Sequence, residues 1–152
     1  MGSRMGSRML IPAGISLVGF VLSLALHVLG LFGVGNPSAV LTLPLQIGVA
    51  VLFLVWCATE RTARAGEPRK SFNASLHKAS PPWLAAATGL VILYAVIGLF
   101  LSFVQRRISG TPEAQEIAAS GRGAFAAAWM AMYALLFTLF YSCWRLVKGR
   151  PS

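Results

Sequence analysis

The chain has 152 residues, of which 57% are hydrophobic and 11% are charged. An average soluble domain carries about 25% charged residues, so this chain has too few charges to cover a water-facing surface, and the composition predicts an integral membrane protein. The net charge is +9, but the cations flank apolar runs. Cations in this position set the membrane topology and contact anionic lipid headgroups, so the charge does not indicate nucleic-acid binding.

In chain order, residues 1–8 repeat the unit MGSR and resemble a tag-like or disordered N-terminus. Residues 9–148 are expected to form one membrane domain, followed by a tail at 149–152. Four apolar runs in that domain reach the roughly 20 residues that a membrane-spanning helix needs. The predicted spans are 10–32, 39–59, 83–104 and 124–146. The fold class is therefore all-α, a four-helix transmembrane bundle.

Two prolines and one threonine predict where the first two helices begin. Pro12 and Pro44 are expected in the first turns of their helices, where a missing N–H costs little. Thr42 is the expected N-cap of the second helix.

The loop cations predict the orientation. Cytoplasmic loops carry an excess of Lys and Arg, and an arrangement with both termini in the cytoplasm places ten of the thirteen cations there. The ten are Arg4, Arg8, Arg61, Arg64, Arg69, Lys70, Lys78, Arg145, Lys148 and Arg150, and the three outside are Arg106, Arg107 and Arg122.

Both long connections contain a possible helix. Phe72 and Leu76 are four residues apart among basic residues, which fits either a short amphipathic helix on the membrane surface or a solvated loop. On the outer side, Thr111 is a good N-cap before Pro112 and Glu113, so a short surface helix is expected from about Pro112 to Ser120.

His27 is the one ionisable side chain well inside a predicted span. Gln46, at a similar depth on the next helix, is the expected hydrogen-bond partner, which makes His27 and Gln46 an intramembrane polar pair. The alternative role for His27 is to bind haem or a pigment. A two-histidine haem site would need a second intramembrane histidine, and His77 lies in a loop.

The ends of the spans carry the residues typical of interface anchors. Trp56, Arg61, Trp83, Trp144 and Arg145 are expected to lie at the membrane–water interface. Cys57 and Cys143 lie at matching depth on the reducing side and are interpreted as buried small residues rather than a disulfide or a metal site.

Small residues at a spacing of four allow helices to approach closely. The pairs Ala85/Gly89 and Ala127/Ala131 have this spacing. Either the pairs close the bundle itself, or they bind helices of a partner; the sequence leaves both open.

Several kinds of chemistry have no residues to support them. The chain has no Asp, and Glu60, Glu67, Glu113 and Glu116 all lie at span ends or in loops, so the carboxylate of an ion-coupled transporter is missing. The sequence also has no Ser/His/Asp set, His/Glu metal cluster or phosphate-binding loop. We therefore expect a protein that is not an enzyme and that has no catalytic residues, bound metal or resident cofactor.

Three short motifs resemble a known group. Ser80-Pro81-Pro82-Trp83, Ile108-Ser109-Gly110-Thr111-Pro112-Glu113 and Trp129-Met130-Ala131-Met132-Tyr133 are similar to segments of small four-helix bacterial membrane proteins of unknown function. Where that group typically has Ser-Gly-His before the Trp-Met, this chain has Ala126-Ala127-Ala128. The resemblance implies the bacterial inner membrane and no particular activity.

Three functional hypotheses follow. The first is a non-catalytic accessory subunit of a larger membrane complex, and the second is a homo-oligomeric channel or passive carrier, for example of anions. The third is haem or pigment binding through His27. The expected partners are the lipid bilayer and other membrane protein chains, or further copies of this chain, but not nucleic acid.

Overall fold

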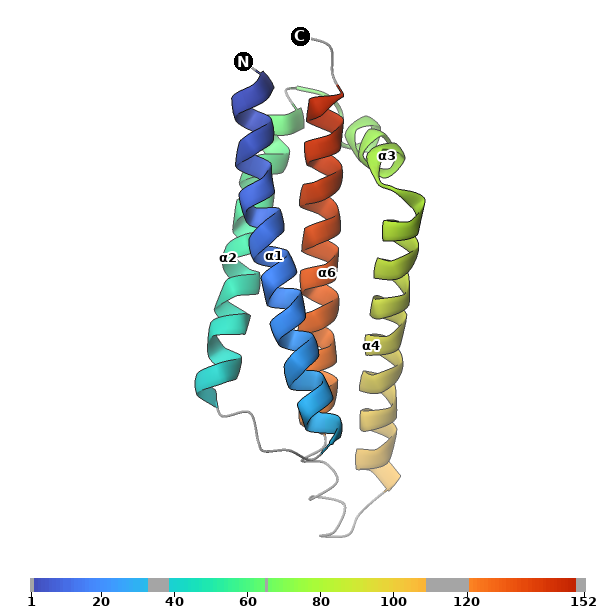
Figure 1. Ribbon diagram of the computed structural model, residues 1–152. Helices are drawn as coiled ribbons and strands as arrows, with labels where there is room; N and C mark the ends of the chain where they lie inside the picture. Colours follow the sequence, from blue (N-terminus) through green and yellow to red (C-terminus); the bar gives the residue numbers. More distant parts are fainter. Residues whose placement is uncertain (1, 33–38, 65, 109–120, 150–152) are drawn as a thin grey trace.

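The computed structural model describes residues 2–32, 39–64, 66–108 and 121–149, all of them in helices and short connections (Figure 1). The helices are α1 (Gly2–Leu31), α2 (Ala39–Arg64), α3 (Arg69–Ala79), α4 (Pro82–Ile108) and α6 (Gly121–Lys148). Four of them are long and apolar enough to cross a membrane, over Met9–Gly30, Leu43–Arg64, Pro82–Leu101 and Ala126–Lys148. The prediction of an all-α protein with four spans is confirmed.

The spans form an up-and-down arrangement centred on α6. α1 and α4 run in one direction, and α2 and α6 run in the other (Figure 1). α6 packs against every other described helix, and its contact with α1 is the most extensive. The start of α1, the end of α6 and the whole of α3 lie at the same end of the bundle, the upper end in Figure 1.

The predicted places of Pro12, Pro44 and Thr42 at helix starts are wrong. α1 begins at Gly2 and α2 begins at Ala39, so Pro12, Pro44 and Thr42 all lie inside helices rather than at their starts. Residues 2–8 are helical and form the first turns of α1, so they belong to the same helix as the first span. A proline inside a membrane helix is tolerated because local adjustments and neighbouring groups satisfy the freed backbone.

α1 meets α6 along a narrow stripe of small and polar residues. Ala13, Ser16, Ser23 and His27 are buried, and their successive spacings of three, seven and four residues keep them on one side of the helix. Within this stripe the Ser16 hydroxyl donates a 2.8 Å hydrogen bond to the carbonyl of Pro12. Small side chains let the two backbones approach closely, which is how helices associate in lipid.

Tyr133 of α6 lies between α1 and α2. Its hydroxyl donates a 2.8 Å hydrogen bond to the Leu45 carbonyl, and its ring occupies the space that a Cβ atom on Gly19 would need. A Cβ on Gly48 would meet the Tyr133 hydroxyl. The bundle therefore requires glycine at both positions, because any side chain there would displace the tyrosine.

Large side chains fill the centre of the bundle nearer to α3. Leu136, Phe140 and Cys143 of α6 are fully buried. Trp56 of α2 packs edge-on against Phe140, with 5.5 Å between ring centroids and an interplanar angle of 86°.

The basic segment after α2 forms a helix, which was one of the two alternatives predicted from the sequence; the other was a solvated loop. Phe72 and Leu76 are the buried residues of α3, and they pack into the main core. α3 lies across the spans rather than along them (Figure 1). The expected helix at 112–120 lies outside the described residues.

Candidate functional site

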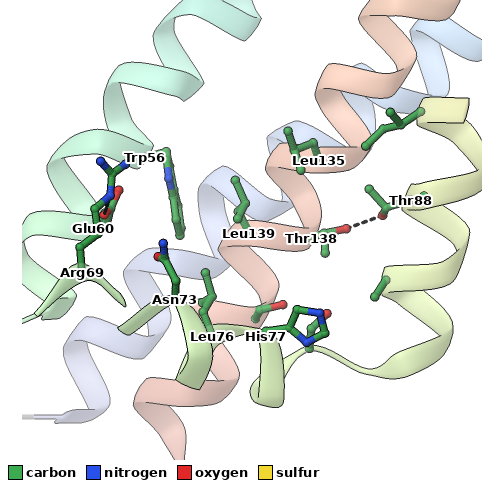
Figure 2. A pocket seen from close by; sticks show the side chains of 15 residues that line it. Trp56, Glu60, Arg69, Asn73, Leu76, His77, Thr88, Leu135, Thr138 and Leu139 are labelled. Carbon is green, nitrogen blue, oxygen red and sulfur yellow. Dashed lines mark hydrogen bonds and ion pairs between the residues drawn. The ribbon is translucent and has the colours of Figure 1, made fainter. Parts of the chain in front are cut away.

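The candidate site is a pocket of about 520 Å³ beneath α3 (Figure 2). α3 lies at the end of the bundle that carries the start of α1 and the end of α6 (Figure 1). Ligand pockets typically have roughly 300–1,000 Å³, so this one can hold a small molecule or one chain of a lipid. Its lining comes from α2 (Trp56, Glu60), α3 (Arg69, Asn73, Leu76, His77), Ser80, α4 (Ala85, Thr88, Gly89, Ile92) and α6 (Leu135, Thr138, Leu139, Ser142).

The rim of the pocket is polar. Arg69 Nε lies 3.2 Å from Glu60 Oε1, in an ion pair that joins α3 to α2 (Figure 2). The Arg69 side chain is 72% exposed, whereas that of Glu60 is 13% exposed. Asn73 and His77 follow Arg69 along α3. The Arg69 guanidinium therefore faces the open side of the ion pair, whereas the Glu60 carboxylate is largely covered.

The depth of the pocket is apolar, with one polar contact on its wall. Leu135 and Leu139 of α6 line it beside Ile92 of α4. Thr138 donates a 2.9 Å hydrogen bond to the Ala134 carbonyl, and the Thr88 and Thr138 hydroxyl oxygens lie 2.6 Å apart (Figure 2). Because the Thr138 proton goes to Ala134, Thr88 is the donor in the bond between α4 and α6.

Two further hydroxyls of the lining lack a partner. Within the described part of the chain, the buried Oγ atoms of Ser80 and Ser142 make no hydrogen bond, and Ser142 as a whole is only 2% exposed. A buried polar group without a partner costs about 1–3 kcal/mol. A molecule that accepted or donated hydrogen bonds here would recover that cost.

A second pocket, of about 320 Å³, lies on the α1 side of α4. Apart from Thr88 its lining is apolar: Leu17, Phe20, Trp83, Leu84, Ala87, Val91, Ala134 and Phe137. Because this pocket lacks a polar rim, it has no groups that would distinguish one ligand from another, and the acyl chains of any lipid can fill it.

His27 has a hydrogen-bond partner on α4 that the sequence did not predict. Its Nε2 lies 2.7 Å from the hydroxyl of Tyr94 on α4, and the two rings meet edge to face. Gln46 is exposed. The expected His27–Gln46 pair stays a prediction, since the bond to Tyr94 occupies only one of the two ring nitrogens of His27. Haem or pigment binding through Nε2 of His27 would require Tyr94 to leave.

Removing the Tyr94 hydroxyl tests this contact. We expect Tyr94→Phe to lower the free energy of unfolding by about 1 kcal/mol, because membrane hydrogen bonds contribute about 0.6–2 kcal/mol. The measurement is thermal unfolding in detergent. The matched control is Tyr141→Phe, which keeps the stacking of the ring on Phe137 and should leave the melting temperature unchanged. Equal melting temperatures for both variants would contradict the assignment.

The small-residue pairs divide between two places. Ala127 and Ala131 are buried in a cluster with Ala95, so they pack α6 against α4 of the same chain. Ala85 and Gly89 line the pocket beneath α3, and a Cβ on Gly89 would meet nothing within 4 Å. One pair therefore closes the bundle, while the other borders open space.

The expected anchors also differ in their surroundings. Trp56 is only 7% exposed and belongs to the core rather than facing lipid, because it packs against Phe140. Trp83 is 67% exposed, and Arg61 and Arg145 are exposed. Trp144 is half-buried beneath Lys148, whose Nζ lies 5.1 Å from the ring centroid.

Cys57 is half-buried and Cys143 is buried, and the two do not form a disulfide. Over residues 2–32, 39–64, 66–108 and 121–149, no group of three or more His, Cys, Asp or Glu residues could hold a metal ion.

Comparison with known proteins finds no match to a family model, to a curated protein or to a solved structure. The resemblance to small four-helix bacterial membrane proteins therefore extends only to the four spans, and the site must be interpreted from its own geometry.

Most of the residues that form the pocket are not predicted from the sequence. Glu60 and Arg69 were expected only as charges at a span end and in a loop, and no role was expected for Asn73, Thr88 or Ser142. The available signal was weak: Thr88, Thr138 and Ser142 are hydroxyl residues inside apolar spans, where polar side chains usually face protein rather than lipid.

Proposed function

We propose that this chain is a non-catalytic accessory subunit of a larger membrane complex, in a bacterial inner membrane. The structure gives it four membrane-spanning helices and therefore contact with the lipid bilayer. The partner chains would be other membrane proteins that pack against its least buried spans.

One observation carries this proposal: the bundle is open on one side. α2 and α4 each pack on α6, but the described residues of the two helices do not pack extensively on each other. Only 17% of the most apolar stretch of α2 and of α4 is buried, against 50% for α6. Helices in membranes associate through packing, so two spans held on one central helix leave surface for further helices.

The orientation we propose places both termini and α3 in the cytoplasm. Most of the cations lie at the end of the bundle that carries α3, and an excess of Lys and Arg is typical of the cytoplasmic side. A fluorescent-protein fusion at the C-terminus should fluoresce, and an alkaline phosphatase fusion there should be inactive. Active phosphatase at that position would reverse the proposed orientation.

Site-specific photo-cross-linking tests the accessory role. A photoreactive side chain would replace Leu54 of α2 or Leu90 of α4, each 68% exposed, and Ile11 of α1, 66% exposed, would serve as the control. We expect the first two positions to cross-link to one defined membrane protein other than this chain, and the control to cross-link only to lipid.

Cross-links exclusively to lipid at all three positions would contradict the proposal. Cross-links between copies of this chain would favour the homo-oligomeric alternative. Within a single copy, the centre of the bundle is filled by Leu136, Phe140 and Cys143, so a channel or carrier would have to form between copies.

A further inference from the structure

We propose that the pocket beneath α3 binds one phospholipid whose headgroup carries both a primary ammonium group and a phosphate. One acyl chain lies in the apolar depth of the pocket, and the headgroup lies at the Glu60–Arg69 ion pair. This proposal is independent of the accessory role, because it concerns a site within one copy of the chain.

The pocket opens at the level of the membrane where lipid headgroups lie. α3 lies across the spans at the end of the bundle (Figure 1) and turns Phe72 and Leu76 inward, while Lys70 and Lys78 are exposed. A helix with one apolar face and one basic face lies in the membrane interface. The pocket beneath it therefore begins at headgroup level and continues into the acyl region.

The pocket is polar at its rim and apolar in its depth, as a phospholipid is polar at its headgroup and apolar along its acyl chains. Arg69, Asn73 and His77 of α3 line its rim, and Ile92, Leu135 and Leu139 line its depth. The side chains in Figure 2 show the same sequence, with Glu60, Arg69 and Asn73 on one side and the leucines of α6 beyond them. An acyl chain is the apolar molecule that a bilayer supplies at high concentration.

The charges at the rim select the headgroup. Glu60 would repel a headgroup that is only anionic, whereas a primary ammonium can donate hydrogen bonds to its carboxylate and to the Asn73 side-chain oxygen. The Arg69 guanidinium suits a phosphate, because its N–H groups match phosphate geometry. Among the nearby charges, Arg61 is exposed, and Glu67 accepts a 3.5 Å hydrogen bond from Ser71; neither lines the pocket.

The unpartnered hydroxyls give a second, independent reason. Ser142 is almost fully buried, and the Oγ atoms of Ser142 and Ser80 are buried donors without a partner among the described residues. Both serines line the pocket. The ester carbonyls of a phospholipid lie between its headgroup and its acyl chains, and they accept hydrogen bonds without donating any.

The test is native mass spectrometry of the purified chain after exchange into micelles that contain equal amounts of phosphatidylethanolamine, phosphatidylcholine and phosphatidylglycerol. We expect one phosphatidylethanolamine to remain bound per chain. Charge-assisted hydrogen bonds contribute most of the selectivity, so Glu60→Gln should reduce the preference for ethanolamine over choline by about tenfold. Arg69→Gln should weaken retention of all three lipids.

One pocket-filling variant and four controls separate occupancy of the pocket from general effects. Glu67→Gln and Arg61→Gln make the same charge changes outside the pocket and should bind as the wild type does. Gly89→Leu adds a side chain to the open space of the pocket and should abolish retention without loss of stability. Gly98→Leu should retain the lipid, because an added Cβ there also meets nothing within 4 Å and Gly98 does not line the pocket. Soluble phosphoethanolamine should not displace it.

Four results would overturn the proposal. The first is the absence of a bound lipid at a stoichiometry of one per chain. The second is equal retention by the Gly89→Leu and Gly98→Leu variants. The third is displacement of the lipid by phosphoethanolamine, and the fourth is a preference for phosphatidylglycerol.

Discussion

Gly19→Leu should be among the most destabilising single substitutions in this chain. A Cβ atom at position 19 would collide with the ring of Tyr133, and the leucine would add three more carbon atoms. The ring would have to move, which would break its hydrogen bond to the Leu45 carbonyl. Overpacking costs about 1–3 kcal/mol and occasionally more; we expect a loss of about 3 kcal/mol, measured as a lower melting temperature in detergent.

Gly14→Leu provides the matched control on the same helix. Gly14 is exposed, and a Cβ there would meet nothing within 4 Å. The control should therefore melt at or above the wild-type temperature, since leucine also favours the helix over glycine. Similar melting temperatures for the two variants would show that Tyr133 does not lie between α1 and α2 as described.

Phe140→Ala is the second large effect. Phe140 is fully buried on α6 and supports the Trp56 ring. Inside a membrane, burial of the ring does not remove it from water. The loss of stability on its removal therefore comes mainly from the cavity and the lost packing. We expect a loss of about 3 kcal/mol, at the lower end of the range for phenylalanine truncation in cores, and a shift in Trp fluorescence.

Phe100→Ala isolates the effect of burial. Phe100 is 65% exposed within the α4 span, so lipid can occupy the space left by its ring. Its melting temperature should stay close to that of the wild type. If Phe100→Ala and Phe140→Ala were equally destabilising, the core would not be centred on α6.

The four spans could be predicted because the signal is local and strong. A run of about 20 apolar residues has one stable form in lipid, since a helix satisfies all its own backbone groups. The helix of α3 was foreseen only as one of two alternatives, because Phe72 and Leu76 show a spacing but not what they pack against. The structure supplies that partner in α6.

The arrangement of the helices could not be predicted from the same signal. Residues that face lipid and residues that face another helix are equally apolar, so hydrophobicity alone does not show which span is central. This explains why the Tyr94 partner of His27 and the burial of Trp56 were not predicted. The expected partner of His27 was inferred from chain proximity, and the expected place of Trp56 at the membrane–water interface was inferred from its position near the end of a span.

The pocket was beyond sequence reasoning for a related reason. Glu60, Asn73, Thr88 and Ser142 come from four helices, and only the tertiary packing brings them together. Each residue alone is compatible with a solvated loop or a satisfied helix face. The small pair Ala127/Ala131 shows the same limit, since its spacing fitted a partner's helix and α4 of the same chain equally well.

The most direct test of the accessory role is the mass and composition of the native particle. The protein would be extracted in mild detergent, sized by light scattering, and its co-purifying chains identified by mass spectrometry. We predict a particle much heavier than one 16.2 kDa chain, with other membrane proteins in fixed ratio. A particle that contains only this chain would contradict the proposed function.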